Sequence, residues 1–95
     1  MATKLHLDGA RIGSEKDLHD EIENQLNPPV YGRNLDALDE VMLQMVEPPV
    51  EVLWTNAERS RAVLGERFDK FVSVFRDAAN DYRSGEYRFV LRMND

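Results

Sequence analysis

The sequence predicts an α/β fold in which a three-stranded parallel sheet, in the order 1-2-3, packs against about four helices. Three short stretches have strand patterns, and segments with helical spacing separate them, as in parallel sheets with helical crossovers. The middle stretch is the most apolar, which is typical of a central strand. The 95 residues, 42% of them hydrophobic, are expected to form one domain over residues 1–95.

The first strand is predicted where Leu5 and Leu7 alternate with polar neighbours, a pattern typical of a half-exposed strand. A turn follows and ends at Ser14, which is placed to cap a helix. Pro28 and Pro29 mark the end of this helical region. Its predicted buried stripe consists of Leu18, Ile22 and Leu26.

Between two proline pairs, residues 30–47 are expected to form a loop and one helix. Gly32 allows a tight bend, and Asn34 is a good N-cap. With about 100° per residue, one side of this helix is apolar. That side carries Leu35, Leu38, Val41, Met42 and Met45, and the other side carries Asp36, Asp39, Glu40 and Leu43. Because the helix has no Lys or Arg to neutralise its carboxylates, we expect it to meet a cation-rich partner.

The second half of the chain is predicted to contain the two other strands and two helices. Asn56 is placed to cap a short helix that stops near Gly65. Ser84 and Gly85 are expected to turn the chain into the last strand. The buried face of the middle strand is Val50, Val52 and Trp54. The strongest helical periodicity lies in Phe68, Phe71, Val72, Phe75, Ala78, Ala79 and Tyr82. The last strand presents Tyr87, Phe89 and Leu91.

The charge is unevenly distributed along the chain. Residues 1–51 contain 11 acidic and 4 basic side chains, a balance of −7, whereas residues 52–95 contain 7 and 8, a balance of +1. An acidic half repels phosphates, so nucleic acid is not expected as a partner. It attracts basic proteins and speeds their docking, although acidity also simply favours solubility.

The residues give no sign of catalysis or of a cofactor or metal. The chain has no cysteine and no apolar run long enough to span a membrane, which fits a cytoplasmic protein. His6 and His19 are outside any ligand motif and are interpreted as surface or edge histidines. The carboxylates of residues 36–40 show no sign of a walled cleft, so a non-enzymatic role is favoured.

The segment from Tyr31 to Leu38 reads Tyr-Gly-x-Asn-Leu-Asp-Ala-Leu. It resembles the signature of the barstar family, intracellular protein inhibitors of secreted microbial ribonucleases, and is the most specific match in the chain. Weaker matches are Leu18-His19, Trp54 and the segment 74–78. The resemblance covers nearly the whole chain and implies a barstar-like fold.

The resemblance implies that this protein inhibits a bacterial, guanyl-preferring extracellular ribonuclease, as a free monomer that forms a 1:1 complex in the cytoplasm. Glu40 stands where the family places the carboxylate that enters the nuclease site as a phosphate mimic. An acidic module that binds a basic non-nuclease protein is the alternative. Val30, Asp39 and Glu40 depart from the family pattern, which leaves the identity of the nuclease open. The expected partner-binding residues are Val30, Tyr31, Gly32, Asn34, Asp36, Asp39, Glu40, Leu43, Gln44, Asp77 and Asp81.

Overall fold

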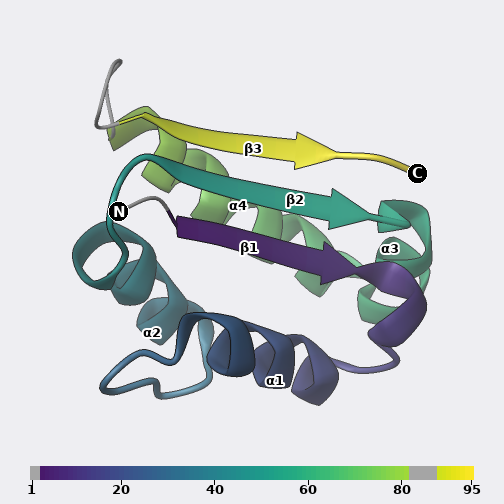
Figure 1. Cartoon of the computed structure of the whole chain (residues 1–95). Helices are drawn as coiled ribbons and strands as arrows, with labels where there is room; N and C mark the ends of the chain where they lie inside the picture. Colours follow the sequence, from purple (N-terminus) through teal and green to yellow (C-terminus); the bar gives the residue numbers. More distant parts are fainter. Residues whose placement is uncertain (1–2, 82–87) are drawn as a thin grey trace.

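The computed structural model describes residues 3–81 and 88–95 and shows one sheet with its helices on one side (Figure 1). The strands are β1 (Thr3–Asp8), β2 (Val50–Thr55) and β3 (Phe89–Met93). Both outer strands pair in parallel with β2, and the order is β1-β2-β3. The predicted topology is therefore confirmed.

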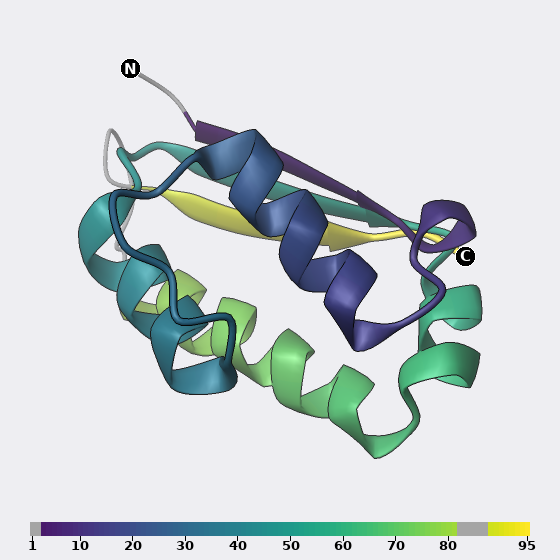
Figure 2. The same cartoon turned by 90° about the horizontal axis from the view of Figure 1, so that it is seen from below.

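The helices are α1 (Glu15–Leu26), α2 (Leu35–Glu40), α3 (Ala57–Leu64) and α4 (Glu66–Asp81). A 3-10 turn, η1 (Gly9–Arg11), follows β1, and a π-helical turn, η2 (Val41–Met45), continues directly from α2. Figures 1 and 2 show that α1, α2, α3 and α4 all cover the same face of the sheet. The opposite face is left without a covering layer among the described residues.

The helix starts follow the predicted signals only in part. Ser14 caps α1, because its Oγ accepts a hydrogen bond from the backbone N–H of Asp17 at 3.2 Å. Asn56 precedes α3 as predicted, but its side chain does not cap that helix. Its Nδ2 donates instead to the Asp8 carboxylate at 2.8 Å, which ties the end of β1 to the start of α3.

The core lies between the sheet and α4. Trp54 is fully buried, and its ring centroid lies 5.0 Å from that of Phe68 and 6.2 Å from that of Phe75. Its Nε1 donates to Ser60 Oγ at 2.9 Å, so the one polar atom of the indole is satisfied. A Cβ at Gly9 would lie 2.0 Å from the Asn56 carbonyl oxygen, so the backbones at that end of the core approach too closely for any side chain.

Side chains alternate along the strands as expected. Leu5, Leu7 and the buried face of β2 point toward the helices, whereas His6 is exposed, as predicted. Tyr82, the Ser84-Gly85 turn and Tyr87 lie outside the described residues, so the predictions made for them stay predictions.

Candidate functional site

The loop before α2 bends at Arg33, whose φ of 59° lies in the left-handed region. The sequence suggests Gly32 for this bend, but Gly32 does not have a left-handed backbone. A Cβ at Gly32 would lie 3.3 Å from the Cβ of Ala37, so its lack of a side chain gives α2 room to approach. Asn34 caps α2 as predicted, since its Oδ1 accepts from the Ala37 N–H at 2.7 Å.

Tyr31, in the same loop, is bound to α1 through His19. The Tyr31 Oη lies 2.5 Å from His19 Nδ1, and Phe71 of α4 packs against the imidazole with 5.5 Å between ring centroids. His19 is 4% exposed, so its interpretation as a surface or edge histidine is wrong. It adjoins the apolar stripe of α1, and the loop and α4 together remove it from water.

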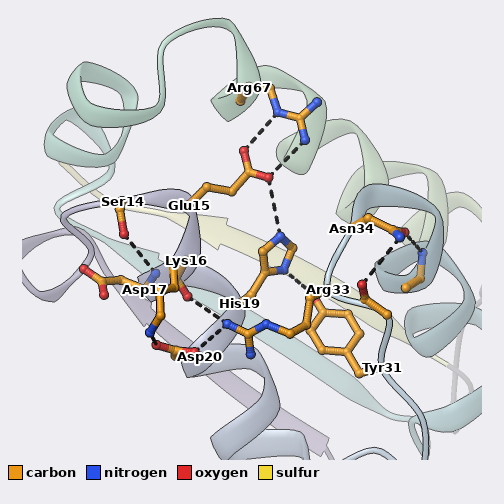
Figure 3. A network of polar contacts seen from close by, with 12 residues as sticks. Ser14, Glu15, Lys16, Asp17, His19, Asp20, Tyr31, Arg33, Asn34 and Arg67 are labelled. Atoms are coloured by element: carbon orange, nitrogen blue, oxygen red, sulfur yellow. Dashed lines mark hydrogen bonds and ion pairs between the residues drawn. The ribbon is translucent and has the colours of Figure 1, made fainter.

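Behind His19, an ion pair joins α1 to α4. The guanidinium of Arg67 donates two hydrogen bonds of 3.0 Å to the two carboxylate oxygens of Glu15. One of these oxygens lies 3.5 Å from His19 Nε2. Figure 3 shows the resulting series from Arg67 through Glu15 and His19 to Tyr31, which connects α4, α1 and the loop.

The protonation of this series follows from its surroundings. Burial lowers the pKa of His19 although Glu15 opposes the shift, so the imidazole is neutral at pH 7. The hydrogen bonds from Arg67 hold the pKa of Glu15 below its usual range, and burial raises the pKa of Tyr31. A proton on Nε2 of His19 then faces the Glu15 carboxylate, while Nδ1 accepts the hydrogen bond of the Tyr31 hydroxyl.

Arg33 fixes the loop to α1 a second time. It donates to Asp20 at 2.5 Å, and Lys16 also donates to Asp20 at 2.9 Å (Figure 3). Arg33 donates to Glu23 as well. The acidic face of α1 is therefore partly neutralised within the molecule. We call the Arg67–Tyr31 series and the ion pairs of Arg33 together the anchor network, which consists of Glu15, His19, Asp20, Glu23, Tyr31, Arg33 and Arg67.

The carboxylates of α2 contrast with the anchor network. Asp36 and Glu40 are exposed and Asp39 is half-exposed. The ion pairs found within residues 3–81 and 88–95 include none of these three, which we call the free carboxylates. They project from a short helix whose start is fixed by the Asn34 cap and whose Leu38 is buried in the core.

The helix predicted for residues 35–47 changes its geometry after Glu40. The π-helical turn η2 shifts the following side chains relative to a regular α-helix, so a spacing of about 100° per residue no longer places them. Leu43 is half-buried and packs against the core, so its predicted position as an exposed apolar group among the acids is wrong. Gln44 is exposed.

The other predicted partner-binding residues flank α2. Val30 is 72% exposed, and among the described residues only Val63 is a further large apolar side chain classed as exposed. Asp77 and Asp81 are exposed on the C-terminal half of α4. Figures 1 and 2 place this half beside α2, and the two helices are in contact. The predicted residues therefore come from the loop before α2, from α2 and η2, and from the half of α4 that neighbours α2.

Two hollows in the described part of the chain lie elsewhere. One is lined by α4 and β3, and the other by the starts of the three strands. Neither is lined by a free carboxylate. Among residues 3–81 and 88–95 no group of three or more His, Asp or Glu side chains could hold a metal ion, and no helix has the length and apolarity to cross a membrane.

A model of the family described as "Barstar (barnase inhibitor)" matches residues 2–94 of this chain. The chain belongs to the barstar family. Within this family it is similar to a protein of Bacillus subtilis (strain 168) that bears the name "Putative ribonuclease inhibitor YrdF". The two are 30% identical over 89 residues, which is 93% of this chain and 97% of the relative.

For this barstar-family protein, analysis of the sequence missed most of the anchor network. Glu15 and Arg67 are 52 residues apart, and only the packing of α4 on α1 makes them neighbours. The resemblance did single out Tyr31 and His19, but nothing in their spacing indicated that they are bonded to each other. An arginine in the middle of an otherwise acidic half was the one signal that could have pointed to Arg33.

Proposed function

We propose that this protein inhibits a microbial, guanyl-preferring extracellular ribonuclease by occupying its active site. The supporting observation is that α2 holds its three free carboxylates on the surface without any cation of the described chain beside them. A ribonuclease concentrates cationic side chains around the phosphodiester that it cleaves. Free carboxylates on a fixed helix match such a site in both charge and shape.

In this proposal Glu40 takes the position of the RNA phosphate. It is exposed at the last turn of α2, and the like charge of Asp36 four residues earlier raises the energy of the free state. Cationic groups of the nuclease would remove this repulsion and donate charge-assisted hydrogen bonds to Glu40. Asp36 adds a second contact, and Asp39, Asp77 and Asp81 lie nearer the rim.

The anchor network supplies the rigidity that the proposal requires. Tyr31, Gly32 and Asn34 belong to a loop that is bonded to α1 on one side and capped onto α2 on the other. A surface fixed before binding loses little conformational entropy when the nuclease docks. Inhibition then needs only occupancy of the nuclease by one inhibitor monomer, with no reaction by the inhibitor.

The proposal is tested by measuring cleavage of RNA by a panel of guanyl-preferring microbial ribonucleases with increasing amounts of the protein. We expect complete inhibition of at least one enzyme at one equivalent, relieved competitively by inorganic phosphate or guanosine monophosphate. Binding that leaves RNA cleavage intact would indicate the alternative function, an acidic module for a basic non-nuclease protein. The cellular site that we propose for the complex is the cytoplasm, where a secreted nuclease is first synthesised.

A further inference from the structure

The two edges of the sheet differ in how their backbone groups are satisfied. At the β1 edge, the side-chain amide of Gln25 accepts a hydrogen bond from the His6 N–H at 2.8 Å and donates one to the His6 carbonyl at 2.6 Å. A side chain of α1 thereby occupies the position that a further strand would take. This edge is closed at its centre.

The β3 edge has no such cover among the described residues. The Arg88 carbonyl accepts a hydrogen bond from β2, and the Asn94 N–H donates one to β2. Alternate residues of a strand direct their backbone groups to the same side. Val90 and Arg92 therefore also face β2. The N–H and C=O groups of Leu91 and Met93 are directed away from the sheet and can pair with another chain.

A groove runs beside this open edge. It has a volume of about 450 Å³ and lies between α4 and β3. Leu91 and Met93 form its sheet side, and both are only partly buried although they pack against the core. An extended segment paired with β3 would place every second side chain over this apolar floor, because strand side chains alternate between faces.

The charges around the edge identify the kind of segment that fits. The groove is lined on the α4 side by Arg76, and Arg88 and Arg92 flank the same edge on the uncovered face of the sheet. Arg92 is paired with Glu51 at 3.3 Å, whereas Arg76 and Arg88 take part in no ion pair within residues 3–81 and 88–95. No described residue that lines the groove is acidic.

We propose that the β3 edge binds an extended segment of a partner protein in which acidic and apolar residues alternate. The segment adds a strand to the sheet, and its apolar side chains lie against Leu91 and Met93. Its carboxylates alternate onto the uncovered face of the sheet, where they lie near Arg88 and Arg92. A second copy of this chain fits less well. Pairing of β3 with another β3 would bring the arginines of both copies together, and like charges on adjacent strands are unfavourable.

The probe for this site is the blocked peptide acetyl-Glu-Val-Glu-Val-Glu-amide, titrated into the ¹⁵N-labelled full chain. We expect saturable shifts at the Leu91 and Met93 amides and slower hydrogen exchange of both. The variant Arg88→Glu should weaken binding about tenfold or more, equivalent to about 1.4 kcal/mol. Its matched control is Arg59→Glu, which makes the same charge change on α3, where the exposed Arg59 lines neither of the two hollows beside β3.

Four results would overturn the proposal. The first is the absence of saturable binding at millimolar peptide, and the second is equal binding of acetyl-Lys-Val-Lys-Val-Lys-amide. The third is a dimer in sedimentation equilibrium whose Leu91 and Met93 amides are protected without peptide, which would assign the edge to a second copy. The fourth is an equal loss of binding in Arg88→Glu and Arg59→Glu, which would show that net charge alone drives binding and would contradict a site at the β3 edge.

Discussion

Among the described residues, charged side chains form ion pairs in the loop that precedes α2, whereas those on α2 itself do not. In the loop, Arg33 is paired with two carboxylates of α1, and Tyr31 is bonded to a buried histidine. On α2, Asp36 and Glu40 stay exposed and outside the ion pairs of the described chain. The difference teaches that internal pairing fixes the backbone of the loop, while the charge of α2 stays unpaired within the described chain, as the proposed docking on a nuclease requires. Each prediction below alters one side of this contrast.

The largest effect is expected on the side of the free carboxylates. Glu40→Ala should weaken binding to the inhibited ribonuclease by about 2–5 kcal/mol, because it leaves cations of the nuclease buried and unpaired. Thermal unfolding should be unchanged or slightly improved, since the repulsion with Asp36 is removed. Calorimetric titration measures the loss of affinity.

The matched control for that change is Asp39→Ala. Asp39 is half-exposed on the same helix, and a charge at the rim is expected to contribute about 1 kcal/mol or less. A severe loss in Asp39→Ala together with a silent Glu40→Ala would place the phosphate mimic one residue earlier than proposed.

In the anchor network, Tyr31→Phe should lower the free energy of unfolding by about 1–3 kcal/mol. The substitution removes the hydroxyl bonded to His19 Nδ1 and leaves that buried nitrogen without its donor. Urea unfolding monitored by the fluorescence of Trp54 gives the value. A stability equal to that of the parent protein would mean that this hydrogen bond does not hold the loop.

Leu43→Ala tests whether Leu43 acts in core packing or in contact with the partner. Leu43 lies in the π-helical turn and is half-buried against the core. We expect a loss of about 1 kcal/mol in stability, less than the cost of emptying a fully buried leucine site. Denaturant unfolding checks this, and binding should weaken only as far as α2 loses order. Weaker binding with unchanged stability would show that Leu43 acts in the contact surface, as the sequence predicts.

The smallest effect is expected from pH acting on His19. Its pKa is lowered in the folded state by burial, so below about pH 6.5 the unfolded chain binds the proton more readily than the native one. Stability should therefore fall as the pH drops from about 6.5 toward the folded pKa. Carboxyl groups whose pKa is lowered in the folded state, such as Glu15, cause a further loss of stability at lower pH. This loss begins near their unfolded pKa and continues toward the folded pKa. In His19→Gln the first decline should disappear while the second stays. A parent and variant with the same profile between pH 5 and 7 would exclude His19 as its source.

The sequence predicted the fold well because its signals are local. Alternation in residues 4–8 and 50–54 fixes which side chains of the strands are buried, and the aromatic spacing of residues 68–75 fixes the inner face of α4. The site was less predictable. No proline or glycine within residues 41–45 signals the π-helical turn, and His19 is buried only because a distant loop covers it.

The parallel order of the sheet also sets how this chain must fold. Thr3 pairs with Val50, 47 positions later, and Val50 pairs with Phe89, 39 positions later, so no two strands form a hairpin. Each strand pairing must close a loop of about 40 residues, which costs conformational entropy before the hydrogen bonds between the strands can form and offset it. During synthesis, β1 has no partner until the whole acidic half has been made, and β2 then lacks its second neighbour until Phe89–Met93 has been made. We therefore expect the helices to form early and the sheet to be completed in the slowest step of folding.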